Sequence, residues 1–268
     1  MSVTGSLTPF DSLAAVMPPG IEIHSLLLPD LKFANREKFL YLRKQFVIEP
    51  ALRHHDFFSR KGGNASHFHK RTEDTGFGVP LIHCLDYNNV FCLRAYGAHA
   101  IQTLKLWQEW AGAVYPHMMQ SVASMSESYL LGHTDEPVFY GSSNYIPFNN
   151  CIRVDGCFAD ADRLSNEVAP MLQNRLIGNL RTFLKNIGLD DRGMHTIFKL
   201  QQYPAEGRSY AALLKDEIIR KTAFEVVVQT NLQLPLFFSL GQNVGYGCGL
   251  FERVMKKSQN QVRNINVF

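Results

Sequence analysis

Hydrophobic positions in the first part of the chain alternate between short runs typical of strands and stretches with helical spacing. The run IEIHSLLL (21–28) is rich in aliphatic residues, which predicts a buried first strand. From 35 to 47, Phe39, Leu42 and Phe46 recur at spacings of three and four. This spacing predicts a helix with one apolar face.

A long irregular stretch then separates this helix from a strand pair. No period holds from 50 to 78, so we interpret this stretch as a functional or mobile loop. LIHCLDY and VFCLRAY (81–96) predict two strands, joined by a hairpin turn at Asn88 and Asn89. A helix is predicted over 98–113, and the residues up to about 131 predict a fourth strand.

The second half repeats this order of elements. A strand is predicted in 139–148, and a leucine every four residues predicts a long helix over 163–187. Two more strands are predicted at 196–203 and 223–230. Between them, EGRSYAALLKDEIIRKT (206–222) is interpreted as a short helical finger.

Together these elements predict an α+β fold of two tandem ferredoxin-like (RRM-like) domains. The first domain is expected at 1–134 and carries the basic loop; the second is expected at 135–268 and carries the helical finger and a glycine-rich loop. In the second domain LPLFFSL (234–240) is interpreted as a shortened second helix, and GLFERV (249–254) as the last strand.

The composition is that of a globular protein in a reducing compartment. Hydrophobic residues make up 46% of the 268 positions and charged residues 19%, which is enough for a sizeable core. No apolar run approaches the length of a membrane span, and the N-terminus lacks the basic start of a signal peptide. The five cysteines form no CxxC pair, which argues against a zinc ribbon or a disulfide framework. We therefore expect a cytoplasmic protein.

Four glycines crowd the segment LGQNVGYGCGLF (240–251). A glycine cluster lets the backbone approach a ligand closely, and an anion such as a phosphate backbone is the natural guest. A dinucleotide-binding loop would need a following helix, and a P-loop would end in Gly-Lys-Ser/Thr; neither is present. An ordinary glycine-rich turn stays open as the simpler interpretation.

Charge is distributed unevenly, although the net charge is only +3. From 36 to 71 there are nine basic residues against three acidic ones, and the stretch from 72 to 151 is acidic overall. Such separation suits a polyanionic partner, although surface charge also clusters by chance.

Several segments resemble the CRISPR-associated RAMP superfamily, above all its repeat-processing endoribonucleases. The resemblance is carried by the glycine-rich loop and by PLIHCLDYNNVFCLRAYGAHAIQTL (80–104), YIPFNN (145–150), LQNRLIGNLRTFLKNIGL (172–189) and FEVVVQTNLQLPLFFSLGQNVGYGCGL (224–250). They occur in the order found in that superfamily. The first 79 residues show no matching motif, and Asn243 stands where many members carry Lys or Arg.

The resemblance implies metal-independent cleavage of CRISPR repeat RNA, with no cofactor. The 2′-hydroxyl of the RNA would attack the adjacent phosphate, leaving a 2′,3′-cyclic phosphate and a 5′-hydroxyl. It also implies that the protein stays bound to the mature guide as a subunit of an effector complex. The general base, where one exists, would lie on or just after the first helix.

In this region His67 and His69 of the HFHKR segment are the first candidates for catalysis, because histidine exchanges protons near neutral pH. Tyr41 is a further catalytic candidate, and Arg36 and Arg43 are kept on the same list, since some members are thought to cut with tyrosine or arginine. Two alternatives stay open: these histidines touch phosphate without catalysing, or they ligate zinc. We interpret the remaining histidines outside the basic segment, His99 among them, as structural.

Basic residues and the glycine loop supply the expected RNA contacts. The predicted RNA-binding residues are Arg36, Arg43, Arg60, Lys61, Lys70, Arg71, Arg181, Lys185, Arg208, Lys215, Arg220, Lys221, Gln242, Asn243, Gly245, Tyr246 and Gly247.

Two rival functions stay open. One is a non-cutting RAMP subunit that binds the guide, and the other is a general RNA-binding module. The second is disfavoured because no strand carries the aromatic RNA-stacking signature of RRM proteins.

Overall fold

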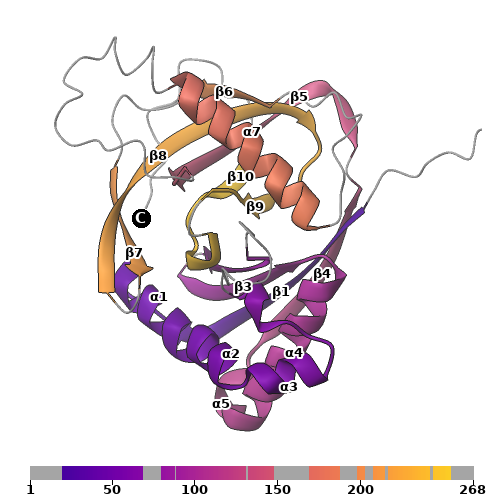
Figure 1. The fold of residues 1–268 in the computed structure, drawn as a ribbon, viewed down its shortest axis with the longest axis vertical. Coiled ribbons are helices and arrows are strands. Elements are labelled where there is room, and N and C mark those ends of the chain that lie inside the picture. Colours follow the sequence, from indigo (N-terminus) through magenta and orange to yellow (C-terminus); the bar gives the residue numbers. More distant parts are fainter. Residues whose placement is uncertain are drawn as a thin grey trace, which may run out of the picture.

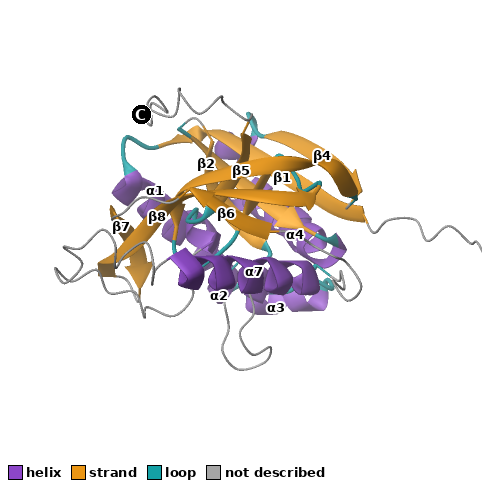
Figure 2. Ribbon diagram, turned by 90° about the horizontal axis from the view of Figure 1, so that it is seen from above, coloured by secondary structure: helices purple, strands orange, loops and turns teal. Residues whose placement is uncertain are grey.

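The computed structural model describes residues 20–68, 80–87, 89–130, 132–147, 169–187, 198–202, 208–214, 217–241 and 244–254. These residues form two antiparallel sheets with helices packed against them, and each sheet with its helices makes one lobe of the molecule (Figure 1). Helices α4 and α7 lie on the same side of the strands (Figure 2).

The first lobe contains a four-stranded sheet in the order β2-β3-β1-β4. Its strands are β1 (Gly20–Lys32), β2 (Ile82–Tyr87), β3 (Val90–Tyr96) and β4 (Ala123–Leu130). Helix α1 (Arg36–Arg43) follows β1, and α4 (Ala98–Val114) follows β3. This is the ferredoxin-like arrangement predicted from the sequence, so that prediction is confirmed.

Strand β1 is buried on both faces because the first sheet lies between its own helices and the second lobe. Leu26 and Leu28 join the core under the helices, which also contains Trp107. Ile21 and Ile23 stand at odd positions, so their side chains face the other side of the strand and join the core of the second lobe. A run of aliphatic residues is what such a strand requires.

The stretch after α1 is more helical than predicted. It forms a π-helical turn η1 (Lys44–Ile48), helices α2 (Glu49–Arg53) and α3 (His55–Arg60), and a 3₁₀ turn η2 (Ala65–His67). The prediction of an irregular loop from residue 50 was therefore wrong up to Phe68, and 69–79 lies outside the described residues. The buried residues Ala51, Phe58 and Phe68 are too widely spaced to show a helical period. A short helix α5 (Pro116–Met119) follows α4.

The second lobe has the same strand order with two strands added, β9 at its edge and β7 beside β8. Its strands are β5 (His133–Tyr145), β6 (Phe198–Gln202), β7 (Arg208–Leu214), β8 (Glu217–Leu232), β9 (Phe237–Ser239) and β10 (Leu250–Val254). The order is β6-β8-β5-β10-β9, and β7 pairs with β8. Helix α7 (Ala169–Asn186) packs Leu172, Leu176 and Leu180 onto this lobe, in agreement with the leucine spacing.

Two predicted helices of the second lobe are strands. The predicted helical finger is a β-hairpin, in which Arg208 lies opposite Ala223 and Leu214 opposite Glu217. Its second strand continues into the core strand β8, so pairing along the ladder outweighs the local preference for helix. The predicted short helix at 234–240 contains β9, which pairs with β10 through Phe238 and Phe251. Seven residues with a proline in second place are too few for a stable helix.

Candidate functional site

The glycine-rich loop packs between the two lobes. Its 3₁₀ turn η4 (Val244–Tyr246) contacts β2 of the first lobe, and both Gly245 and Gly247 are buried. Gly247 has a φ of +72°, and a Cβ there would lie 2.8 Å from the carbonyl oxygen of Cys84. Glycine is therefore required at this position by both the backbone conformation and the close approach of β2.

The sequence suggested that N–H groups of this loop bind an anion, but two of them donate to carbonyl groups of the protein itself. The N–H of Gly247 donates to the carbonyl of Val244 (3.0 Å), and that of Gly249 donates to the carbonyl of Asn144 (3.0 Å). The expectation of close backbone approach at this loop agrees with the structure. These two N–H groups, however, are used inside the protein.

Two arginines of α1 hold the loop in place. Arg43 is 1% exposed; its Nε donates to the carbonyl oxygen of Gly245, and an Nη donates to the carbonyl oxygen of Phe68 at 3.2 Å. An Nη of Arg36 donates to the sulfur of Cys248 at 3.5 Å, and its guanidinium lies over the ring of Phe39. The structure thus places Arg43, a predicted RNA contact, in the interior, where it bonds protein carbonyls.

Asn144, at the end of β5, joins the loop to the second sheet and was missed by sequence reasoning. Its Nδ2 donates to the carbonyl of Gly247 at 3.2 Å, and its Oδ1 accepts from the N–H of Leu250 at 3.2 Å. A single asparagine near a strand end is typical of many turns, so the sequence carries no signal that separates this one.

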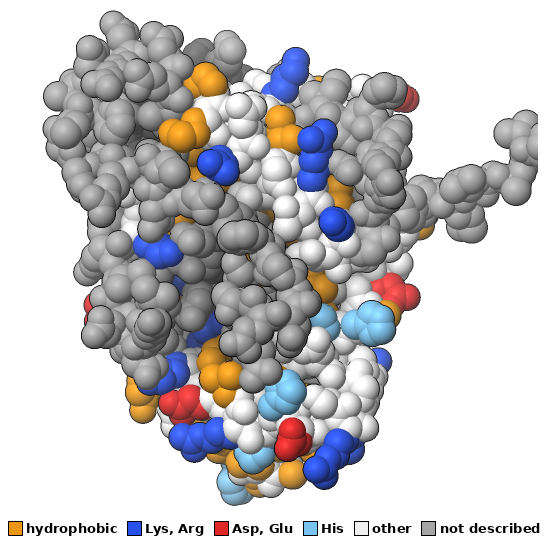
Figure 3. All heavy atoms as spheres, viewed as in Figure 1, with side chains coloured by type: hydrophobic (Ala, Val, Ile, Leu, Met, Phe, Trp, Pro, Cys, Tyr) orange, Lys and Arg blue, Asp and Glu red, His pale blue; other side chains and the backbone are white. Residues whose placement is uncertain are grey.

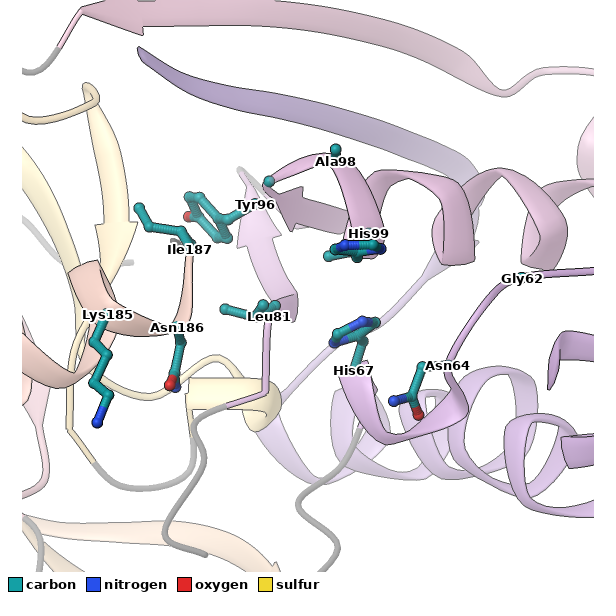
Figure 4. A pocket seen from close by; sticks show the side chains of 12 residues that line it. Gly62, Asn64, His67, Leu81, Tyr96, Ala98, His99, Lys185, Asn186 and Ile187 are labelled. Carbon is teal, nitrogen blue, oxygen red and sulfur yellow. The ribbon is translucent and has the colours of Figure 1, made fainter. Parts of the chain in front are cut away.

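Three segments far apart in the sequence converge on a pocket of about 410 Å³. They are η2 with the residues before it, the N-terminal turn of α4, and the C-terminal turn of α7. The lining residues are Gly62, Asn64, His67, Leu81, Tyr96, Gly97, Ala98, His99, Ala100, Lys185, Asn186 and Ile187. The rings of His67 and His99 point toward one another, and Lys185 and Asn186 lie at the far side of the pocket (Figure 4).

Local structure fixes the position of His67. The side chain of Asn64 accepts a hydrogen bond from the N–H of Ser66 (2.9 Å) and so caps the turn η2. The N–H of Asn64 in turn donates to Oγ1 of Thr103 on α4 (2.9 Å). These two bonds tie η2 to the helix that carries His99.

The electrostatics of the pocket favour a neutral histidine at position 67. Burial, with a smaller contribution from His99, lowers the pKa of His67 from 6.5 to about 4. The side chain is therefore unprotonated at neutral pH, which is the form that accepts a proton, and its low pKa makes it a weak base. Burial also raises the pKa of Tyr96 to about 12, so this phenol keeps its proton.

The first turn of α4 adds positive potential to the same pocket. The helix begins after Gly97, whose φ is +79°, with no side-chain cap and no acidic residue in its first turn. The N-terminus of a long helix and a nearby lysine both favour an anion. Two facing histidines, Lys185 and this helix end therefore suit a phosphate group whose ester bonds are broken by proton transfer.

His99 lines the pocket beside His67, whereas the sequence analysis interpreted its helix only as core and this histidine as structural. The available signal was a histidine in the first turn of a helix that begins at a glycine. In the structure this turn lines the pocket beside His67.

The other predicted residues fall into three groups. The first group is exposed: Tyr41 is 55% exposed and does not line the pocket, and Arg60 and Arg181 also lie on the surface. The second group has partners or is partly buried. In it, Lys61 forms an ion pair with Glu109 at 2.6 Å. Lys221 is partly buried, which lowers its pKa. His69, Lys70, Arg71, Lys215, Gln242 and Asn243 lie outside the described residues, and the side chains of Arg208, Arg220 and Tyr246 are also not described.

Two further observations concern metal ions and membranes, and both refer to the described part of the chain. There, no three His, Cys, Asp or Glu side chains form a group able to hold a metal ion. No helix among the same residues has the length and apolar character to span a membrane.

Known proteins resemble this chain in structure, although none was matched by sequence. No family model and no curated protein matches the sequence. Among solved structures, the chain is similar to the CRISPR RNA processing endoribonuclease Cas6b (TM-score 0.57, 16% identity) and to a second Cas6b structure (0.59, 15%). It is also similar to Csf5, a type IV Cas6 crRNA endonuclease (0.55, 12%). Each comparison covers 88% of this chain and 100% of the other. At this identity the similarity establishes the shared fold.

Replacing Arg43 by methionine should destabilise the protein. The change leaves the carbonyls of Gly245 and Phe68 without their donor, so the free energy of unfolding should fall by about 3 kcal/mol. Urea unfolding measures this change. The matched variant Arg53→Met, at an exposed position of α2, should stay within about 0.5 kcal/mol of the wild type. Equal effects at the two sites would contradict the role given to Arg43.

The pKa of His67 predicts its titration and a pH dependence of stability. Imidazole NMR signals of His67 should titrate near pH 4. Because this pKa lies below the ordinary value of 6.5, the unfolded state binds the proton more tightly. The contribution of His67 to the free energy of unfolding is therefore full above pH 6.5 and declines as the pH falls toward 4. Titration of His67 near 6.5 would show that the pocket does not bury this ring.

Proposed function

We propose that this chain is a repeat-processing endoribonuclease that binds CRISPR repeat RNA, as a stem-loop, and cuts the precursor into mature crRNA. The observation that carries the proposal is the pair His67 and His99, whose rings face each other across a pocket that Lys185 also lines. The shared fold supports it, since the solved structures with this fold are described as CRISPR RNA processing enzymes. The two domains proposed at 1–134 and 135–268 both contribute, the histidines from the first and Lys185 from the second.

The proposed reaction needs no metal, because RNA carries its own nucleophile. Neutral His67 takes the proton of the 2′-hydroxyl, and the 2′-oxygen forms a bond to the adjacent phosphorus. The bond from phosphorus to the 5′-oxygen breaks, and His99, as the general acid, gives a proton to that leaving oxygen. The products are a 2′,3′-cyclic phosphate and a 5′-hydroxyl, so atoms and protons balance.

Positively charged groups would stabilise the phosphate between the two proton transfers. Negative charge builds on the phosphate oxygens as the 2′-oxygen attacks. The ammonium group of Lys185 and the N-terminal turn of α4 are the groups of the pocket that stabilise such charge. Both are in place before the reaction begins.

RNA contacts outside the pocket are proposed at the exposed basic residues of both lobes. These include Arg60 and Lys61 on the first lobe and Arg181 on α7. An A-form stem shows proteins mainly its phosphates and its shape, so such contacts position the stem while the pocket selects the bond that is cut. Retention of the product by these contacts would make the protein a subunit of a larger effector complex.

The first test is cleavage of the cognate repeat RNA by purified protein in excess EDTA. The same RNA is also prepared with 2′-deoxyribose at each candidate position. We expect one cut that survives EDTA and that disappears with a single deoxy substitution. Tight binding without any cut would replace the proposal by a non-catalytic guide-binding subunit.

Substitution of either histidine should abolish most of the activity without loss of binding. His67→Ala and His99→Ala should each lower the single-turnover rate by about 10²–10⁴-fold, the usual contribution of a general acid or base. The dissociation constant for deoxy-substituted RNA should change little. His117→Ala, at an exposed histidine of α5, is the control and should cut at the wild-type rate. Full activity of either pocket variant would exclude that histidine from the chemistry.

A further inference from the structure

One face of α7 is exposed along its length and leads into the pocket. Asn174, Gly178, Arg181 and Lys185 recur at spacings of four, three and four, which places them on one side of the helix. All four are exposed, whereas Leu172, Leu176, Leu180, Phe183 and Leu184 on the opposite side are buried. Lys185 also lines the pocket. The exposed face and the histidine pair thus belong to one continuous surface.

Gly178 is the unusual member of this face. It lies in the middle of a helix of 18 residues, where glycine destabilises the helix relative to alanine. Its φ is not positive, and a Cβ built there meets no atom of the described residues within 4 Å. Neither the backbone nor packing within the described protein therefore requires glycine here. Gly178 therefore faces open space beside the described part of the protein.

The charge of α7 indicates what occupies that space. The helix contains Arg175, Arg181 and Lys185 and no Asp or Glu. Lys and Arg side chains spread over this part of the surface, with histidines below them (Figure 3). A face made of asparagine, glycine, arginine and lysine lacks the apolar centre of a protein interface. It matches a polyanion that must come close to the helix backbone.

We infer that the sugar–phosphate backbone of the RNA lies directly against α7 at Gly178 and runs along this face into the histidine pocket. Arg181 and Lys185 bind phosphates on the way, and the missing side chain at 178 lets the ribose approach the helix. Lys185 is seven residues from Gly178, which is about 10 Å along the helix axis. The inference rests on the proposed function and adds to it the path by which the substrate reaches the cut.

The test separates helix stability from RNA binding by adding a side chain at Gly178. Gly178→Leu and the milder Gly178→Ala improve the helix, so each should raise Tm, by about 2–4 °C for leucine. Affinity is measured by fluorescence anisotropy with repeat RNA that carries 2′-deoxyribose around the cut. Gly178→Leu should weaken binding at least about tenfold, with a smaller loss for Gly178→Ala. Arg181→Ala should lower the slope of log affinity against log salt by about one.

Gly112 of α4 provides the matched control. It is also a helical glycine whose Cβ would meet nothing within 4 Å, and it lies 13 residues, about 20 Å, from His99 along the same helix. Gly112→Leu should raise Tm and leave RNA affinity unchanged. Lys105→Ala, at an exposed lysine of α4, is the control for the loss of one positive charge in Arg181→Ala.

The possible outcomes are distinct. A more stable Gly178→Leu protein that binds RNA as tightly as the wild type overturns the inference and leaves the proposed function standing. Such a result would also direct attention to a protein partner for this face. If the wild-type protein binds no repeat RNA, the proposed function fails, and the inference fails with it. Selective loss of affinity in the Gly178 variants, with Gly112→Leu unchanged, supports both.

Discussion

The structure depends on one buried cation, the guanidinium of Arg43. Burying a charge is costly unless hydrogen bonds replace its water, and Nε and one Nη of Arg43 donate to the carbonyls of Gly245 and Phe68. A Cβ at Gly245 would lie 3.2 Å from an Nη of Arg43, so the bare glycine and the arginine fit each other. Phe68 directly follows His67. One side chain therefore fixes the glycine loop of the second lobe and the turn that carries the proposed base.

The pocket exists only because the two lobes are docked. His67 and His99 come from the first lobe, whereas Lys185 and Ile187 come from the second. Tyr96 connects them, with its ring 4.8 Å from that of His83 and 5.3 Å from that of Phe183 on α7. A Cβ at Gly97 would lie 3.9 Å from the Cβ of Ile187, so the start of α4 directly abuts the end of α7. A change in the docking would separate the lysine from the histidines before it altered either sheet.

Burial determines the protonation state of His67 in the pocket. The contacts that pack η2 against α4 partly shield His67 from water, and this partial burial lowers its pKa. A neutral imidazole that shares a pocket with a lysine and a helix N-terminus is a combination that water would weaken. The chemistry proposed here therefore uses an environment that the fold creates for other reasons.

The sequence by itself determined the strands and the two helices α1 and α4 of the first lobe, and β5, α7, β6, β8 and β10 of the second. The spacing of hydrophobic residues reports whether a segment is helix or strand and which of its sides is buried. His67 became a catalytic candidate from its residue type and from the resemblance, which implies a base on or just after the first helix, and that role stays a prediction. Only the tertiary structure decided that residues 206–222 include a hairpin, since pairing with neighbouring strands outweighs a local preference for helix. Likewise, Arg43 and Lys185 are both basic residues on amphipathic helices. Packing buried the first under the glycine loop and left the second at the pocket, and no local pattern distinguishes the two.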